Sequence, residues 1–256
     1  MRSADIDLRA PAGAGMVATS QPLAVRAGID ALGAGGSAAD AAVAAAAVLC
    51  VTEPLGTGVG GDAFALYWAP GADAPIGLDA AGPSGAGATL DAIQGAGHRV
   101  MPQSGPWTVT VPGAVDAWAT LLERFGRLSL ADALAPAIAI ARDGFEVTPF
   151  IAAQWTAAAG SIDEAGSAVF APGGRAPAAG QRFANPELGA LLELIARDGP
   201  DGFYRGEPAE RIGAAVERAG GPLRATDLAT WPGARWVEPI SAPFRGVEVF
   251  ELPPPG

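Results

Sequence analysis

Small and apolar residues recur with helical spacing early in the chain and predict two consecutive helices. Pro22 suits the first turn of a helix, where its missing N–H costs nothing, and the glycines of residues 33–36 end that helix. Ser37, with Asp40 three positions later, has the pattern of a capping box that starts a second helix over residues 38–49. That helix is nearly all alanine and valine, so it is apolar on every side and must be buried.

Short apolar runs bounded by glycine and proline predict the strands. The first is expected over Met16–Thr19. Phe64–Trp68 is expected to be a strand, with Ile76–Leu78 as its partner after a turn. Trp107–Val111 predicts a further strand and Val247–Leu252 the last one.

Helical periodicity dominates the middle of the chain. Pro136 predicts a kink or a restart inside one of these helices. Residues 80–105 show little periodicity, and residues 161–184 are expected to be rich in loops. The pattern is α+β, with helices expected over residues 114–125, 129–142, 150–159, 185–197 and 207–219 and a helical turn over 226–231.

Composition narrows the chemistry. The chain has 256 residues, of which 50% are hydrophobic and 17% charged, which is typical of a globular protein. Its net charge of −11 disfavours nucleic acid and anionic membranes as partners. All 16 basic residues are Arg, which removes any Schiff-base lysine, phosphate-loop lysine or Ser–Lys dyad.

Cysteine and histidine each occur once. Cys50 ends the alanine-rich helix and is expected to be a buried, inert thiol. His98 lies in a glycine-rich loop and cannot build a zinc site or a Ser-His-Asp triad on its own, so we expect no metal and no cofactor. Residues 1–15 contain no apolar leader-like run and residues 41–51 are too short to span a membrane, which predicts a cytoplasmic protein.

A glycine-rich loop over residues 56–61 fits G-x-G-x-x-G. A dinucleotide site needs a strand before that motif and a helix after it, whereas here the order is reversed, so we interpret the loop as a tight turn for close packing. Glu53 and Asp62 flank the loop and offer a carboxylate pair for acid–base work, although solvated or capping roles are the default for acids. No complete catalytic constellation is present in the sequence.

Four stretches of sequence follow one another in a characteristic order. They are PLAVRAGIDALGAGGSAADAAVAAA running into EPLGTGVGGDAFALYW; TVPGAVDAWATLLERFGRLSLADALAPAIAIARDGFEV; GFYRGEPAERI with GGPLRATDLATW; and WVEPISAPFRGVEVFELPPPG. Together they cover nearly the whole chain. In this combination the sequence resembles the N-terminal part of the γ-glutamyltransferase family.

The resemblance implies an N-terminal-nucleophile hydrolase with a four-layer αββα sandwich, of which residues 1–256 would form a helix-rich, incomplete single domain. In this family a precursor cuts itself into a large and a small subunit, and the new N-terminal Thr of the small subunit attacks the substrate. The resemblance therefore implies that this chain holds no catalytic residue, is inactive alone, and needs a small-subunit segment as its partner.

One departure from the family pattern concerns the substrate. Members that act on γ-glutamyl groups carry an Arg in a D-x-R-E-x-A-P segment, which pairs with the α-carboxylate; here Ala81 takes that position, followed by Gly82 and Pro83. This segment is more similar to that of γ-glutamyltransferase-like amidohydrolases and acylases, which implies a small non-glutamyl amide as substrate. The alternatives are true γ-glutamyl transfer, with Arg99 as the nearest substitute in sequence, and a non-catalytic remnant that serves as a folding or binding partner.

Overall fold

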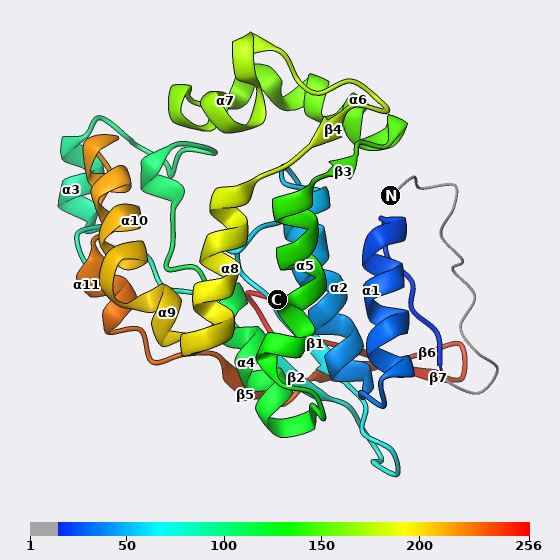
Figure 1. Ribbon diagram of the computed structural model, residues 1–256. Helices are drawn as coiled ribbons and strands as arrows, with labels where there is room; N and C mark the ends of the chain where they lie inside the picture. The colour runs from blue at the N-terminus through cyan, green and yellow to red at the C-terminus, as the bar shows by residue number, and fades with distance from the viewer. Residues whose placement is uncertain (1–14) are drawn as a thin grey trace. The chain divides into compact units, whose positions relative to one another are not determined.

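The computed structural model describes residues 15–256, which divide into two compact units (Figure 1). Among the described residues, unit 1 joins 15–58 with Leu122–Arg197, and unit 2 joins Val59–Leu121 with Asp198–Gly256. Each unit is therefore built from two segments that are far apart in sequence. Unit 1 is mainly helical, and unit 2 carries the longer strands.

Three helices form the centre of unit 1. Helix α1 (Pro22–Gly33) packs against α2 (Ala38–Thr52), and α2 packs against α5 (Leu130–Asp143), as Figure 1 shows. Most of α2 is buried, as its composition predicts. Gly28 lets α1 and α2 lie close together, because a Cβ at this position would come within 3.1 Å of the carbonyl oxygen of Ala41.

Two capping boxes start α2 and α5, as predicted. The capping box of α2 differs from that of α5 in that its acid, Asp40, is fully buried. Helix α2 also continues to Thr52 rather than ending near residue 49. Of the kink or restart predicted at Pro136, the restart is wrong, because α5 runs through the proline as one helix. Leu134 and Ala137 are fully buried on either side of it, and this packing holds the helix together.

The remainder of unit 1 is less regular. Residues 161–184, expected to be rich in loops, contain a helix and a strand. Trp155 and Phe183 pack edge to face with ring centroids 4.8 Å apart. The elements are β3 (Phe145–Glu146) paired with β4 (Arg182–Phe183), helices α6 (Pro149–Ala158), α7 (Glu164–Phe170) and α8 (Pro186–Asp198), and 3₁₀ turns at Ala159–Ser161 and Pro172–Gly174.

Unit 2 contains a three-stranded antiparallel sheet of order β1-β2-β5. The predicted hairpin of β1 (Phe64–Tyr67) and β2 (Ile76–Asp79) is confirmed, and β5 (Arg235–Val237), which the sequence does not predict, pairs with the other edge of β2. A separate hairpin joins β6 (Ile240–Phe244) to β7 (Val247–Glu251), the predicted last strand.

Two strand predictions are wrong. Residues 16–19 are irregular, and Val17 packs instead against the glycine of α1 at position 28. Residues 107–111 form no strand, because a 3₁₀ turn occupies Pro106–Thr108 and only Thr110 makes an isolated bridge, to Ser84. β-prone side chains form a strand only where a neighbouring strand accepts their hydrogen bonds.

The helices of unit 2 lie near those positions that the sequence predicts, apart from two short ones. The hydroxyl of Tyr204 donates to the carbonyl of Pro112 at 2.7 Å and accepts the N–H of Asp116 at 3.3 Å, which fixes the start of α4. No helix of residues 15–256 is both long enough and apolar enough to cross a membrane. The helices are α3 (Leu90–Gly95) and α9 (Asp201–Tyr204), both unexpected, with α4 (Ala114–Phe125, shared by the two units), α10 (Gly206–Arg218) and α11 (Ala225–Ala229).

Candidate functional site

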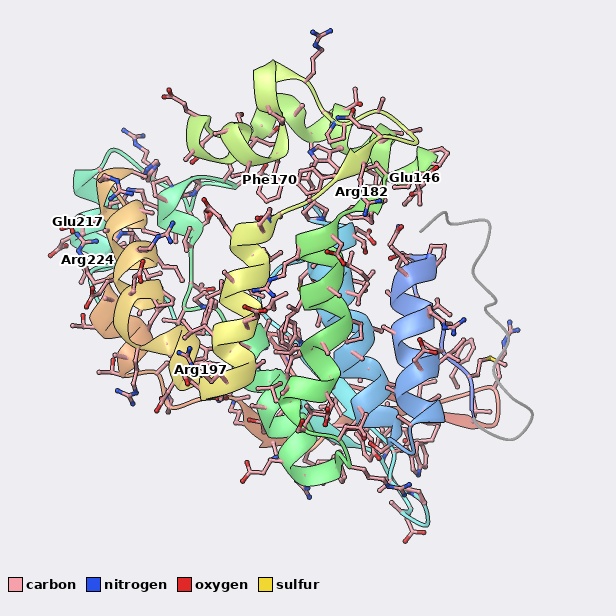
Figure 2. The ribbon with its side chains drawn as sticks, in the orientation of Figure 1. Glu146, Phe170, Arg182, Arg197, Glu217 and Arg224 are labelled. Atoms are coloured by element: carbon pink, nitrogen blue, oxygen red, sulfur yellow. The ribbon has the colours of Figure 1, made fainter. Side chains whose placement is uncertain are left out.

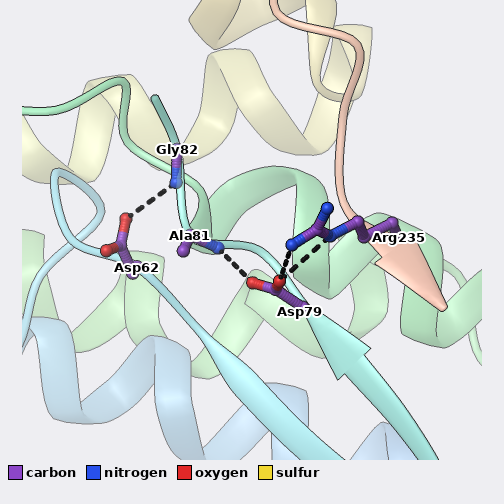
Figure 3. Close-up of polar contacts among 5 residues, drawn as sticks. All are labelled: Asp62, Asp79, Ala81, Gly82 and Arg235. Atoms are coloured by element: carbon purple, nitrogen blue, oxygen red, sulfur yellow. Dashed lines mark hydrogen bonds and ion pairs between the residues drawn. The ribbon is translucent and has the colours of Figure 1, made fainter. Parts of the chain in front are cut away.

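The segment that follows β2 carries three of the predicted substrate-binding residues (Figure 3). Asp79 ends the strand, is only 5% exposed, and accepts the N–H of Ala81 on Oδ1 at 2.9 Å. The next N–H, from Gly82, points to Oδ1 of Asp62 at 3.4 Å. Ala81 and Gly82 are thus held by backbone hydrogen bonds to two carboxylates, whereas Pro83 has no N–H to donate and is exposed.

Arg235 lies beside this segment, although nothing in the sequence links it to Ala81. It stands directly opposite Asp79 in the β2–β5 register. Its Nε and Nη2 donate to Oδ2 of Asp79 at 3.0 and 2.7 Å, while 69% of its side chain remains exposed (Figure 3). The guanidinium that shares the carboxylate of Asp79 with the backbone of Ala81 therefore comes from the neighbouring strand, β5.

Two glycines allow the backbone to pack tightly around the segment. A Cβ at Gly82 would lie 1.7 Å from the carbonyl oxygen of Val111, and a Cβ at Gly113 would lie 1.6 Å from that of Ala80. The carbonyl of Gly61 accepts the N–H of Gly113 at 2.9 Å, next to the start of α4. The predicted order of helix, loop and strand around the glycine-rich loop is confirmed, but a Cβ at Gly60 would meet no atom within 4 Å, so the close packing predicted for this loop is not seen at that position.

The two acids that flank the glycine-rich loop have different hydrogen-bond donors. The pKa of Asp62 is raised, mainly because the carboxylate is partly buried and also because the negative charge of Asp79 is near. The hydrogen bond from the N–H of Gly82 lowers this pKa, but by less. Glu53 belongs to unit 1, where it accepts a hydrogen bond from the hydroxyl of Ser20. Of these two acids, Asp62 is thus the one that contacts the predicted segment, through the N–H of Gly82.

The other candidates lie elsewhere in unit 2. Arg99 follows α3 on an exposed segment and forms no hydrogen bond or ion pair with any residue of 15–256, so the structure does not join it to Ala81. His98 packs edge-on against Trp107, with ring centroids 6.2 Å apart. The role proposed for Arg99 stays a prediction.

An open cavity of about 360 Å³ in unit 2 is lined by Trp107, Arg224 and Asp227 but by none of the predicted site residues. Its charged groups already have partners within the fold. Arg224 forms an ion pair with Glu217 at 3.3 Å (Figure 2). Asp227 accepts backbone N–H groups at 2.8 and 3.0 Å. Both charged groups that line this cavity are therefore paired within the fold, and 43% of the Arg224 side chain stays exposed.

The lone cysteine, Cys50, lies in the interior of unit 1. Its side chain is 3% exposed, and burial raises the pKa of the thiol to about 12. The thiolate, which is the reactive form, is therefore scarce at neutral pH. The prediction that Cys50 is buried is confirmed, and its inertness stays a prediction.

Comparison with known proteins gives consistent matches. A family model described as gamma-glutamyltranspeptidase matches residues 24–256. The glutathione hydrolase-like YwrD proenzyme of Bacillus subtilis is 38% identical over 245 residues, which cover 93% of this chain and 46% of that protein. This chain spans about half the length of such curated relatives.

Solved structures agree in fold. The cephalosporin acylase of Bacillus halodurans superposes with a TM-score of 0.84 at 42% identity, over 92% of this chain and 45% of that one. The γ-glutamyltranspeptidase of Helicobacter pylori gives a TM-score of 0.89 at 27% identity, over 96% of this chain and 72% of that one. These neighbours show the N-terminal-nucleophile α+β fold that the sequence resemblance implies.

Proposed function

Since this chain belongs to the γ-glutamyltranspeptidase family, we propose that it forms the large-subunit portion of an amidohydrolase that cleaves a small non-glutamyl amide. A Thr at the N-terminus of a second segment, outside this chain, attacks the amide carbonyl, with its own α-amino group as base. The amine leaves with a proton, and water hydrolyses the resulting ester to release the acid. Our proposal assigns no catalytic residue to this chain.

The observation that carries the substrate assignment is the methyl group at Ala81. A γ-glutamyl α-carboxylate needs a bidentate Arg at this position, and a methyl group offers no hydrogen bond. The backbone N–H of Ala81 is already bound to Asp79. The higher identity to an acylase than to a transpeptidase of known structure supports the same assignment.

The β6–β7 hairpin supports a second segment as the partner. Paired residues share a face, and one face of this hairpin exposes four large apolar side chains, whereas Phe250 on the other face packs on Trp68. A hairpin of two strands is marginal in water, and exposed apolar patches of this kind mark interfaces. We propose that the nucleophile-bearing segment covers this face, which consists of Ile240 (53% exposed), Phe244 (60%), Val247 (60%) and Val249 (49%).

Replacing one residue on each face tests this assignment. Val249→Asp buries a charge in the proposed interface and should prevent the large and small chains of the full-length protein from co-purifying. Glu248→Gln, on the opposite face, should leave co-purification unchanged. Co-purification of the Val249→Asp chains at the wild-type level would contradict the proposed interface.

The proposed substrate class is tested with the full-length protein. We expect kcat/KM for short acyl p-nitroanilides to exceed that for γ-glutamyl p-nitroanilide by at least about tenfold, because one charge-assisted bidentate pair is worth about this factor or more. Robust γ-glutamyl turnover that is lost on Arg99→Ala would instead establish the second candidate, true γ-glutamyl transfer. The matched variant Arg175→Ala removes another exposed guanidinium and should change neither rate.

A non-catalytic remnant is the remaining alternative. It is supported if the sequence after Gly256 holds no Thr-led segment in frame, and it is contradicted if such a segment is present and the full-length protein cleaves itself there. A cytoplasmic location stays a prediction from residues 1–15, of which residues 1–14 lie outside the described residues.

A further inference from the structure

We propose that Asp227 is a positioning residue, which holds the segment of residues 79–87, here called the site segment, in place for substrate binding without touching the substrate. This role rests on the proposed function and deepens it. It gives the stretch GGPLRATDLATW, residues 220–231, a part in the same site.

The site segment is held at both ends and open in the middle. At its start, Asp79 ends β2, is buried and is ion-paired (Figure 3). At its end, Oδ1 of Asp227 accepts the N–H of Ala86 at 3.0 Å. Pro83 and Ser84, between these anchors, are exposed. A backbone that is fixed in this way is suited to bind a ligand, because little of it has to be ordered when the ligand arrives.

Two glycines let the end of the site segment lie directly against the loop that precedes α11. A Cβ at Gly85 would come within 2.7 Å of the Cα of Leu223. A Cβ at Gly87 would lie 3.2 Å from the carbonyl oxygen of Pro222. Gly85 is buried in this contact, so a side chain at that position would push the two backbones apart.

Asp227 joins this loop to the site segment through both of its carboxylate oxygens. Oδ2 accepts the N–H of Arg224 at 2.8 Å, which is the local capping bond of α11. Oδ1 bonds to Ala86, which lies 141 positions away in sequence. A carboxylate forms stronger hydrogen bonds with backbone N–H groups than a neutral acceptor does. The first bond serves the helix, and the second reaches the site segment.

The loop that carries Asp227 is fixed by the interior of unit 2. Leu223 and Leu228, on either side of the carboxylate, are fully buried. A Cβ at Gly213 of α10 would lie 2.4 Å from the backbone nitrogen of Ala225, so α10 packs directly on the loop. Because the loop cannot shift without disturbing this packing, the bond to Ala86 fixes the site segment relative to the core of unit 2.

Ala86 is only three positions from Pro83, the last of the predicted substrate-binding residues in this segment. The carbonyl of Pro83 accepts the N–H of Val111 at 2.9 Å, and Ser84 forms a bridge with Thr110. If Ala86 is released, this contact with residues 110–111 is the nearest restraint left on that side of Pro83. Residues 81–83 are then less ordered in the free protein, and the substrate has to order them when it binds, which raises KM.

The test uses the full-length, processed protein and an acyl p-nitroanilide as donor. Asp227→Ala should raise KM roughly three- to tenfold, which is the worth of about one hydrogen bond, while kcat changes less than about twofold. Asp227→Asn keeps one acceptor oxygen, is the milder change for folding, and should give a KM between those of the wild type and Asp227→Ala. A residue that only stabilises the fold would instead lower the amount of active protein, and so the apparent kcat, and leave KM unchanged.

Matched variants control for the loss of the capping bond. Asp132 occupies the same capping-box position in α5 and contacts only Ser129, so Asp132→Ala should leave KM unchanged. Gly85→Ala disturbs the same docking from the other side and should also raise KM, whereas Gly95→Ala, whose Cβ would meet no atom within 4 Å, should not. An unchanged KM in both Asp227→Asn and Gly85→Ala, or a fall in kcat in place of the rise in KM, would overturn the positioning role.

Hydrogen exchange separates the positioning role from the proposed substrate class. The backbone amides of residues 84–88 should exchange faster in Asp227→Ala than in the wild type, and Asp132→Ala should match the wild type there. If γ-glutamyl p-nitroanilide is the donor that the protein hydrolyses, the proposed substrate class fails, and the same rise in KM for that donor supports the positioning role. If the protein hydrolyses acyl p-nitroanilides but exchange and KM are equal in all three proteins, the positioning role fails and the proposed function stands.

Discussion

Replacing Asp40 by Asn isolates the role of one buried carboxylate in unit 1. The side chain is fully buried, and it accepts three backbone N–H groups: that of Ser37 at 2.6 Å, that of Arg127 at 2.9 Å and that of Leu128 at 3.0 Å. It therefore starts α2 and also holds the turn between α4 and α5. Asn has nearly the same shape but only one acceptor oxygen.

The expected cost follows from these contacts. Either orientation of the Asn amide leaves at least one of the three N–H groups facing an NH₂ group, and a buried donor without an acceptor costs about 1–3 kcal/mol. The remaining bonds lose the assistance of the charge. We expect Asp40→Asn to lower the free energy of unfolding by about 2–3 kcal/mol at pH 7.

Asp132→Asn provides the matched control, because Asp132 occupies the same position in the capping box of α5 but is exposed and contacts only Ser129. Water replaces its lost contacts, so we expect a cost of about 0.5–1 kcal/mol. Guanidinium chloride unfolding of the wild type and both variants, followed by circular dichroism, measures the difference. Equal costs for the two variants would refute the assignment.

The pH dependence gives an independent check on Asp40. Burial alone would raise the pKa of Asp40, but the N–H donors of Ser37, Leu128 and Arg127 outweigh it and lower the pKa below its usual value. A lowered pKa adds stability that is complete above the unfolded value of about 4 and is lost as the pH falls through the folded value. The gap between wild type and Asp40→Asn should therefore narrow below about pH 4, and a constant gap would contradict this account.

Three further predictions concern packing and burial. Gly113→Ala should prevent unit 2 from folding, because the added Cβ would lie 1.6 Å from the carbonyl oxygen of Ala80. Gly33→Ala should be tolerated, because its Cβ would meet no atom within 4 Å. The soluble yield and melting temperature of both variants measure this difference, and equal melting temperatures would contradict it. Tyr204→Phe removes a buried hydroxyl that is hydrogen-bonded to two backbone groups, and it should lower the free energy of unfolding by about 1–2 kcal/mol. Denaturant unfolding measures this, and an unchanged unfolding midpoint would contradict the prediction. Because burial raises its pKa to about 12, Cys50 should resist a thiol-reactive dye at pH 8 until denaturant is added, and fast labelling of the native protein would show that the thiol is accessible.

Local chemistry explains which elements the sequence predicts well. The start of α2 depends on Ser37 and Asp40, which are neighbours in sequence, and the end of α1 depends on glycines that follow at once. The strand expected over residues 107–111 fails for the opposite reason. Its residues are β-prone, but whether a strand forms depends on a partner that the local sequence does not specify.

The candidate site shows the same limit. The resemblance directs attention to Ala81, and the nearest Arg in sequence is Arg99, which the structure leaves exposed and unpaired among residues 15–256. The Arg that lies beside Ala81 is Arg235, whose partner Asp79 is 156 positions away in sequence. Only the register of β2 with β5 brings the two together, and β5 is too short to be predicted from its pattern.

The most direct test of this account compares amide hydrolysis by the full-length protein with that by residues 1–256 alone. The account predicts that the full-length protein divides into two chains, one with an N-terminal Thr, and hydrolyses an acyl p-nitroanilide, whereas residues 1–256 produce no p-nitroaniline above the uncatalysed rate. Hydrolysis by residues 1–256 alone would contradict it, because the nucleophile would then lie within this chain.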